Sequence, residues 1–515
     1  MRVLGSLIVL GAALMALPAL AQQATPPVSV TGGSISGTDN GEVRTWFGVP
    51  FAAPPVGDLR WRSPQAVLPW QDVKETRAFA PACRQTVTWI SNPQSEDCLY
   101  LNIWAPPNAK KEQAEKLPVI VWIHGGGYFG GTGAQPLYDG TRLTKKGVIV
   151  VTLNYRLGIF GFLATPDLSA ESPDLASGNQ GIEDQIAALA WVKANISAFG
   201  GDPERVTIIG ESAGSNSVAV LVVSPAAKGL FQRAIAESGN YSVPLDSSES
   251  GNFDRPTAET QGAAFVKAQG AANLADLRRM DADTLIHQTW APRVIVDGHV
   301  LREDMTTTYR HHRQNDVPIL VGWNADEGKD LAPEILGTGD FNATNHKVLI
   351  TKLLGHAPTE ALLATYPGAT DAEARTSINH LTSDWWGWRM WYWTSLQAQA
   401  GGAKPWLYYF VHSPAEPATP CGYGCQAGHG AEIPFVFDQL DQDSRPWSDE
   451  DRQLADRLAT YWTNFAKSGN PNGNGLKNWP AFDGDNSSVF RIGTEEEIKA
   501  RGTLPDFDLF GSPKP

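Results

Sequence analysis

The sequence predicts an α/β protein with a large, mostly parallel central sheet and helices on both faces. Residues 147–155 form a continuous run of β-branched and apolar residues, as a strand buried on both faces requires. Residues 178–193 then place apolar side chains at helical spacing, and a new apolar strand begins at Val206. Strand, helix and strand in this order indicate right-handed crossovers and a doubly wound sheet.

The length and charge of the chain limit its class. Its 515 residues, 42% of them hydrophobic, are enough to bury a large core. The formal net charge of -14 argues against a nucleic-acid partner, which would need a basic face. Acidity of this degree indicates solubility and identifies no substrate.

Residues 1–21 have the pattern of a secretory signal peptide. A short basic start precedes the apolar run 3–17, which is too short to span a bilayer, and Ala19-Leu20-Ala21 provides a cleavage site. We therefore expect a mature chain that begins near Gln22, carries no membrane span and is periplasmic or extracellular. Its oligomeric state cannot be read from the sequence.

Four cysteines are consistent with an oxidising compartment. Cys83 and Cys98 bracket a loop that a disulfide could close. Cys421 and Cys425 enclose Gly-Tyr-Gly, whose glycines would allow a very small loop. A redox pair or a metal site with nearby histidines is the alternative, but a redox pair usually has two intervening residues. We expect two disulfides and no metal.

The N-terminal part predicts a hairpin and two core strands. Residues 28–37 and 42–51 alternate apolar and polar side chains around a turn, as a hairpin does, and residues 54–61 form a loop. Residues 95–104 and 117–124 are strongly apolar and predict strands.

Three glycines, Gly125 to Gly127, follow the second of these strands directly. They could be a flexible turn. Their position between a strand and Tyr128 favours another interpretation, in which the bare backbone lets the amides of Gly126 and Gly127 approach a reacting carbonyl and bind its oxyanion.

The segment from Val206 to Val220 predicts a nucleophile elbow. Four β-favouring residues lead into Gly210-Glu211-Ser212-Ala213-Gly214, and helix-compatible residues follow. A side chain at position 210 or 214 would collide with the neighbouring strand or helix, whereas Ser212 is held out at the tip of the turn. The amides of the following helix then point at negative charge that develops beside the hydroxyl.

The chain resembles the type-B carboxylesterase family of the α/β-hydrolase fold, which includes para-nitrobenzyl esterases, carboxylesterases and cholinesterases. The matching segments extend through the whole mature chain: Gly48-Val-Pro-Phe-Ala-Ala-Pro-Pro, Glu96-Asp-Cys-Leu-Tyr-Leu-Asn, His124-Gly-Gly-Gly-Tyr, Asn179-Gln-Gly-Ile-Glu-Asp-Gln, Gly210-Glu-Ser-Ala-Gly and Trp462-Thr-Asn-Phe-Ala-Lys-Ser-Gly-Asn-Pro. The resemblance implies one catalytic domain over residues 22–515, no cofactor, and a disulfide between Cys83 and Cys98.

A serine nucleophile needs a base and an acid that orients the base. In this fold the acid precedes the histidine. The apolar strand from Val317 opens into Asp326-Glu327, and only one of two adjacent side chains can face the histidine. The residues alone leave this choice open. The resemblance to the family's Asp-Glu-Gly segment places the acid at Glu327.

The base must be one of ten histidines. His311 and His312 lie in a polar run, and His412 ends an apolar strand with neighbours that match no motif. His429 lies in a glycine-flanked loop that resembles the family's histidine loop, so we expect it to be the base. The resemblance also implies that Ala213 completes the oxyanion hole with its amide. It further places Glu211 and Ser238 in the shell that orients water and the triad.

The substrate pocket is the least readable part. Residues 240–315 and 335–400 have helical character and are expected to form lids over the carboxyl edge of the sheet. The segment Trp385–Trp393 holds five tryptophans in nine residues. Core packing is the favoured interpretation. An aromatic wall for an aryl or long-chain ester, with Arg389 pairing with a substrate carboxylate, is the alternative.

These features predict a serine carboxylic-ester hydrolase that forms an acyl-enzyme on a small-molecule ester. Specialised hydrolysis of bulky feruloyl, polycarboxylate or mycotoxin-type esters, or acyl transfer to another alcohol, is the alternative within this chemistry. A non-catalytic binding protein of the same fold is the alternative outside it. Because the chain retains Ser212, Glu327 and His429, the catalytic interpretation is favoured.

Overall fold

The computed structural model describes residues 23–107, 115–240, 254–337, 340–415, 425–442, 444–484, 488–500 and 504–510. The predicted signal peptide and Cys421 lie outside these residues, so both assignments stay predictions. In the described part, no helix has the length and apolar character needed to cross a membrane.

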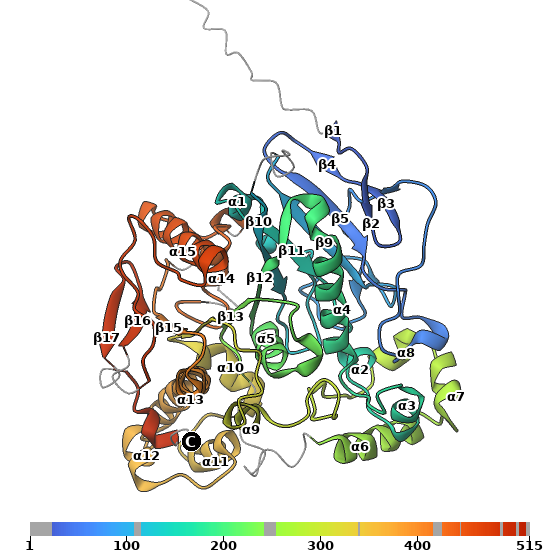
Figure 1. The fold of residues 1–515 in the computed structure, drawn as a ribbon. Coiled ribbons are helices and arrows are strands. Elements are labelled where there is room, and N and C mark those ends of the chain that lie inside the picture. The colour runs from blue at the N-terminus through green and yellow to red at the C-terminus, as the bar shows by residue number, and fades with distance from the viewer. Residues whose placement is uncertain are drawn as a thin grey trace, which may run out of the picture.

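A twelve-stranded sheet, counted over the described residues, runs through the molecule (Figure 1). Its central strands pair in parallel from β11 to β16, and the pairs at both edges are antiparallel. In spatial order the strands are β1 (Gln23–Ala24), β4 (Thr38–Asp39), β5 (Arg44–Pro50), β9 (Tyr100–Ala105), β11 (Ile149–Leu153), β10 (Leu117–Ile123), β12 (Gly201–Glu211), β13 (Arg233–Glu237), β14 (Ile319–Asn324), β15 (Pro405–Phe410), β16 (Ser488–Ile492) and β17 (Glu497–Ala500).

The central strands are apolar on both faces because each face is covered by helices. Along β10, Val119, Val121 and Ile123 belong to one core, while Ile120 and Trp122 belong to the core on the opposite face. This alternation is the period of two expected of a strand. The predicted mostly parallel sheet between two helical layers is thus confirmed.

Helices from distant parts of the sequence make the two layers. Residues of α4, α5 and the second half of α13 belong to one core, and residues of α1, α14 and α15 to the other. The α-helices are α1 (Thr141–Lys145), α2 (Gly158–Gly161), α3 (Pro166–Glu171), α4 (Gln180–Asn195), α5 (Ala213–Val223), α6 (Arg255–Ala268), α7 (Leu274–Arg279), α8 (Ala282–Ile286), α9 (Met305–Arg310), α10 (Glu327–Leu336), α11 (His346–Leu354), α12 (Glu360–Thr365), α13 (Asp371–Ala400), α14 (Ile433–Val436) and α15 (Asp449–Ser468).

The N-terminal segment forms two antiparallel pairs. The strand β2 (Val28–Val30) pairs with β3 (Gly33–Ser36), and β4 pairs with β5. A three-stranded sheet joins β2, β3 and β6 (Lys74–Glu75), and β7 (Ala82–Cys83) pairs with β8 (Gln94–Ser95). The hairpin is therefore divided between a small sheet and the edge of the large one.

The strand predicted from residue 95 begins only at Tyr100. The preceding residues make other contacts. Glu96 forms an ion pair of 2.6 Å with Arg60, and Cys98 is bonded to Cys83. The disulfide implied by the family resemblance is present.

The regions expected to be helical lids contain the helices α6 to α9 and α11 to α13, joined by non-helical segments such as residues 287–304, and α13 also forms part of the core. This 30-residue helix starts with a capping box at Thr370 and ends at Gly401. Its residues Trp391 and Trp393 are buried in the core that includes β10 and β14. The favoured interpretation of the tryptophan segment, core packing, is confirmed for these two side chains.

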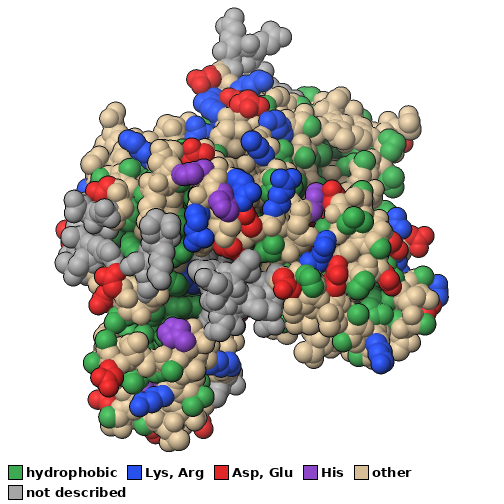
Figure 2. All heavy atoms as spheres, turned by 60° about the horizontal axis from the view of Figure 1, so that its bottom comes forward, with side chains coloured by type: hydrophobic (Ala, Val, Ile, Leu, Met, Phe, Trp, Pro, Cys, Tyr) green, Lys and Arg blue, Asp and Glu red, His purple; other side chains and the backbone are tan. Residues whose placement is uncertain are grey.

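Lys and Arg side chains lie interspersed with Asp and Glu on the face drawn in Figure 2.

Candidate active site

The predicted elbow lies where β12 ends and α5 begins. Ser212 has φ 55° and ψ -121°, a conformation that L residues rarely adopt and that places the side chain at the tip of the turn. A Cβ on Gly210 would lie 2.5 Å from Gly214, and a Cβ on Gly214 would lie 2.0 Å from the carbonyl oxygen of Ile123. The expected crowding at both glycines is confirmed.

The glycine loop lies directly against the elbow. A Cβ on Gly125 would be 2.8 Å from the carbonyl oxygen of Glu211, so the two backbones are in close contact. Gly126 and Gly127 have φ values of 102° and 59° and line the same cavity as Ser212. Within the described chain, their N–H groups donate to no protein acceptor. Both donors can therefore bind an incoming oxygen.

His429 and Glu327 form a buried pair. The Nδ1 atom of His429 lies 2.5 Å from a carboxylate oxygen of Glu327, and both side chains are almost inaccessible to water. The other oxygen of Glu327 accepts a hydrogen bond of 2.8 Å from the backbone N–H of Asn324. Glu327 begins α10, so a helix and the preceding strand β14 fix its carboxylate.

The structure places the neighbouring acid, Asp326, elsewhere. Its carboxylate accepts the backbone N–H of Ala427 at 3.1 Å. One turn along α10, Asp330 accepts the backbone N–H of His429 at 3.0 Å. These acids hold the histidine loop in place, and of the two adjacent candidates only Glu327 reaches the imidazole.

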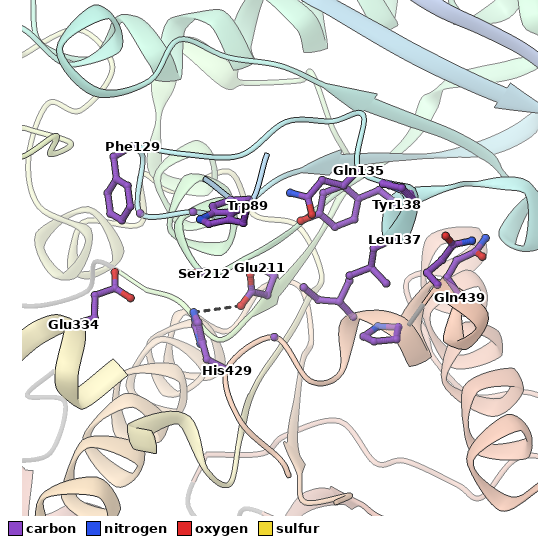
Figure 3. Close-up of a pocket in the computed structure, with 18 of the residues that line it drawn as sticks. Trp89, Phe129, Gln135, Leu137, Tyr138, Glu211, Ser212, Glu334, His429 and Gln439 are labelled. Carbon is purple, nitrogen blue, oxygen red and sulfur yellow. Dashed lines mark ion pairs between the residues drawn. The ribbon is translucent and has the colours of Figure 1, made fainter. Parts of the chain in front are cut away.

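The second nitrogen of His429 faces the elbow. Its Nε2 atom lies 3.3 Å from a carboxylate oxygen of Glu211, and His429 and Ser212 line one cavity (Figure 3). Three segments that are far apart in the sequence therefore meet at the carboxyl edge of the sheet.

Burial and charge control the protons at this edge. Burial raises the pKa of Glu211 to about 8. Burial lowers the pKa of His429, but the carboxylates of Glu211 and Glu327 outweigh this effect and raise it to about 10. The charge of each of these two groups therefore favours the ionised form of the other.

Two further carboxyl groups are buried behind the histidine. Burial raises the pKa of Glu432 to about 7 and that of Glu237 well above its ordinary value. Asn324 donates to Glu432 at 2.5 Å, Ser238 donates to it at 3.5 Å, and Trp462 donates to Glu237 at 2.5 Å. The predicted supporting residue Ser238 thus contacts Glu432.

Trp386 connects α13 to this edge of the sheet. Its indole N–H donates to the carbonyl oxygen of Ser238 at 2.7 Å, and its ring centre lies 6.0 Å from that of His429 with the planes at 87°. The guanidinium of Arg389 stacks on Trp385 and Trp386, at 4.7 and 5.3 Å from the ring centres. Arg389 is buried and is not among the described residues that line the cavity, so the structure does not support it as a substrate-pairing residue.

The cavity above Ser212 has a volume of about 600 Å³. Trp89, on the loop closed by the Cys83–Cys98 disulfide, forms one wall together with Phe129 (Figure 3). Both aromatic side chains are exposed, at 55% and 43%. An exposed aromatic rim beside Ser212 can contact an apolar group of a bound ligand.

The remaining candidate histidines lie outside this cavity. His311 and His312 are exposed, and His412 is buried against Asp451. Within the described residues, no cluster of three or more His, Cys, Asp or Glu side chains could hold a metal ion.

Sequence reasoning missed several residues of the site. Glu432 follows His429 by three residues in an otherwise apolar segment, and that isolated charge was an available signal. Trp89, Gln135 and Gln439 had no comparable local signal, because segments remote in the sequence bring them to the site. Trp386 lies in the tryptophan-rich segment that the sequence singled out, but its contact with His429 was not predicted.

A model of the carboxylesterase family matches residues 24–508. The chain is 36% identical over 501 residues to the fumonisin B1 esterase of Sphingopyxis macrogoltabida, covering 91% of this chain and 87% of that protein. It is 35% identical over 496 residues to the para-nitrobenzyl esterase of Bacillus subtilis strain 168, covering 91% of this chain and 94% of the relative.

Solved structures show the same similarity. One structure of a PNB esterase superposes with a TM-score of 0.79 at 32% identity, covering 95% of this chain and 99% of that one. A thermophilic PNB esterase gives a TM-score of 0.79 at 33% identity, with coverage of 94% and 99%.

Proposed function

Because this chain belongs to the carboxylesterase family and is a carboxylic ester hydrolase, we propose that it works through an acyl-enzyme on Ser212. His429 acts as the base, and Glu327 orients it. The observation that carries the proposal is the convergence of the elbow, the glycine loop and the buried His429–Glu327 pair on one cavity.

In the first step the Ser212 hydroxyl attacks the ester carbonyl and gives its proton to Nε2 of His429. The carbonyl oxygen becomes an oxyanion, which the amides of Gly126, Gly127 and Ala213 stabilise. When the intermediate collapses, His429 protonates the leaving alcohol, and the acyl group stays on Ser212.

In the second step water attacks the acyl-serine ester and His429 again accepts the proton. Collapse releases the carboxylic acid and returns the proton to Ser212. Glu327 fixes the tautomer that keeps Nε2 available, and its charge stabilises the imidazolium in both steps.

We also propose that residues 22–515 are one catalytic domain of a secreted or periplasmic protein. The main sheet recruits strands from residue 23 to residue 500, which supports a single unit. The disulfide between Cys83 and Cys98 supports an oxidising compartment.

Intact-mass spectrometry with a slowly hydrolysed aryl carbamate or phosphonate tests the acyl-enzyme. The wild-type protein should gain one adduct, mapped to Ser212 by peptide analysis, with parallel loss of esterase activity. Ser212→Ala should gain none, and its kcat should fall by about a thousandfold or more.

Ser215→Ala is the matched control. Ser215 lies on α5, the helix that begins directly after Ser212. Its hydroxyl donates to the carbonyl oxygen of Gly239, and it does not line the cavity. This variant should still be labelled at Ser212. An adduct on another residue, or full turnover by Ser212→Ala, would contradict the mechanism and would favour a different nucleophile.

A further inference from the structure

Gln439 is a buried polar residue that lines the cavity above Ser212. It lies in the segment that follows α14, and 5% of the residue is exposed. Figure 3 shows it beside Leu137 and Tyr138, on the side of the cavity away from Glu334. The catalytic groups described above do not include this residue, so its amide is open to another role.

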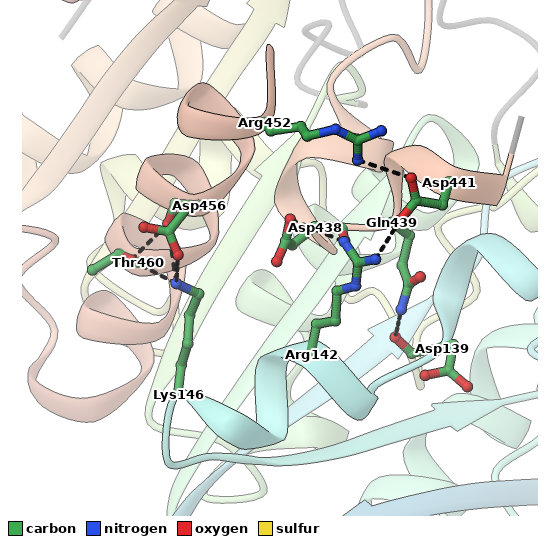
Figure 4. Close-up of polar contacts among 9 residues, drawn as sticks. All are labelled: Asp139, Arg142, Lys146, Asp438, Gln439, Asp441, Arg452, Asp456 and Thr460. Atoms are coloured by element: carbon green, nitrogen blue, oxygen red, sulfur yellow. Dashed lines mark hydrogen bonds and ion pairs between the residues drawn. The ribbon is translucent and has the colours of Figure 1, made fainter. Parts of the chain in front are cut away.

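A hydrogen bond orients the amide of Gln439. Its nitrogen Nε2 donates to the carbonyl oxygen of Asp139 at 2.9 Å (Figure 4). A carbonyl oxygen can only accept, so the NH2 branch of the amide must face Asp139 and the oxygen Oε1 must lie on the other branch. The chemistry of this contact therefore decides which way the amide points.

The oxygen Oε1 of Gln439 is an acceptor without a protein donor. Among the described residues, none donates a hydrogen bond to it. It is not sealed from solvent either. Because Gln439 lines the cavity and is otherwise buried, this oxygen is accessible from the cavity and can accept a hydrogen bond from a ligand.

Neighbouring contacts hold Gln439 in place. Its backbone N–H donates to the carbonyl oxygen of Pro434 at 2.7 Å. On α1, Arg142 donates to the carbonyl oxygen of Asp438 at 2.5 Å and to the carboxylate of Asp441 at 2.5 Å (Figure 4). Residues on both sides of Gln439 are thus tied to α1, and an acceptor fixed in this way loses little conformational entropy when a ligand binds.

The chemistry of Oε1 suits a hydroxyl donor. A single neutral acceptor satisfies the one O–H of a hydroxyl group, whereas an ammonium group would keep further N–H donors and a charge to be desolvated. Leu137 and Pro434, which belong to the two segments joined at Gln439, also line the cavity and offer no side-chain polar atom. A ligand group without a donor at this place would displace water from Oε1 and leave it unpaired, so it would bind more weakly.

We propose that Gln439 is a specificity-determining residue whose Oε1 accepts a hydrogen bond from a hydroxyl group of the substrate, away from the ester bond. Such a contact selects esters of hydroxylated compounds that are long enough to reach it. The proposal rests on the acyl-enzyme function above. It adds a binding contact and leaves the catalytic steps unchanged.

Matched hydroxyl and methoxy esters test the proposal. One series has the group at the end of the acyl chain, as 4-nitrophenyl ω-hydroxyalkanoates against the ω-methoxy analogues. The other has it on the alcohol, as monoacetates of α,ω-diols against acetates of their monomethyl ethers. Both series cover increasing chain lengths. In at least one series, the ratio of kcat/KM for the hydroxyl ester to that for the methoxy ester should peak at one chain length, at about tenfold.

The methoxy group separates the two ends of the amide. It keeps an oxygen that could accept from the remaining hydrogen of Nε2, and it lacks the donor that Oε1 requires. A peak in the ratio therefore reports on the oxygen. A peak at one chain length also distinguishes a fixed contact from a general preference for polar substrates.

Gln439→Leu should remove the peak by lowering the highest ratio about tenfold. Gln442→Leu is the matched control, because Gln442 lies in the same segment and lines the cavity, but it is exposed and solvent already satisfies its amide. This control should keep the peak. Gln439→Asn serves as a second variant if Gln439→Leu folds poorly in thermal melts. It should also lower the ratio, because the shorter side chain cannot bond to Asp139 and place its oxygen as before.

A flat ratio in both series of the wild type, or a peak that survives in the Gln439 variants, would overturn the proposal. A peak that is lost equally in Gln442→Leu would also overturn it, since the effect would then not come from Oε1 of Gln439. Hydrolysis of the 4-nitrophenyl esters that requires Ser212 would leave the acyl-enzyme function standing in each of these cases.

Discussion

Two buried histidine–carboxylate pairs in this molecule have the same separation and different surroundings. His429 lies 2.5 Å from Glu327, and His412 lies 2.5 Å from Asp451. The first pair opens through Nε2 onto the cavity beside Ser212. The second pair joins the segment after β15 to α15, the imidazole packs against Phe435, and His412 lines a different cavity that does not contain Ser212.

The carboxylate partners also have different functions. Asp451 is the third residue of α15 and forms a capping box with Ser448, so it stabilises the helix terminus as well as His412. Glu327 makes no such cap. One of its carboxylate oxygens is hydrogen-bonded to Nδ1 of His429, and the other accepts the backbone N–H of Asn324. A short His–carboxylate contact therefore does not identify a catalytic base. What matters is the group that the other nitrogen faces.

The largest expected effect separates the two histidines. His429→Ala should lower kcat by about a thousandfold or more, because it removes the base from both steps. His412→Ala should keep kcat within about threefold of the wild type and lower the melting temperature instead. Steady-state kinetics and thermal melts of both purified variants measure this contrast, and comparable losses of kcat would remove the distinction.

A second contrast concerns the two adjacent acids. Glu327→Gln should lower kcat by about a hundredfold or more, since the imidazolium loses its charged partner. Asp326→Asn retains an oxygen that can accept the N–H of Ala427, so its kcat should change by less than about threefold. If the two variants lose equal activity, the acid of the triad has been assigned wrongly.

The pH profile sharpens the role of Glu211. A carboxylate 3.3 Å from Nε2 favours the charged imidazolium, and removing it lowers the pKa of His429. Neutral imidazole then forms at lower pH, so the acid limb of the kcat/KM profile of Glu211→Gln should move down by about one pH unit. A shift to higher pH would show that Glu211 does not act through its charge.

The smallest expected effect concerns stability at the second pair. Burial raises the pKa of Asp451, but hydrogen bonds from Ser448 and His412 outweigh this, and the net pKa lies below 3.8. Its stabilisation is therefore present above pH 3.8 and is lost as the pH falls through the lower, folded-state pKa. Asp451→Asn should lower the free energy of unfolding by about 1 kcal/mol at pH 7, and the difference should shrink below pH 4. Urea titrations of both proteins at pH 7 and below pH 4 check this. If the difference in unfolding free energy is the same at both pH values, the charge of Asp451 is not the cause of the stabilisation.

Short segments of the sequence predicted the centre of the site because the relevant signals are contiguous. The apolar strand, the glycines around Ser212 and the helix that follows all lie within 15 residues. The strain at Ser212 and the crowding at Gly214 follow from that local pattern. The family resemblance, rather than the residue types, favoured Glu327 over Asp326.

Other parts of the site could not be predicted because they depend on long-range packing. The five tryptophans on α13 have similar local sequence signals, yet Trp393 is buried in the core and Trp386 contacts His429. The sequence suggested Arg389 as a partner for a substrate carboxylate. The structure stacks Arg389 on Trp385 and Trp386, away from the cavity that Arg445 lines.

The sequence by itself determined the sheet, the elbow and the residue types needed for ester hydrolysis, since strand and turn formation depend on neighbours along the chain. Only the tertiary structure decided which acid reaches His429, which carboxyl groups are buried, and which arginine lines the cavity. These properties depend on the distance between side chains and on their exclusion from water, and both are set by segments hundreds of residues apart in the sequence.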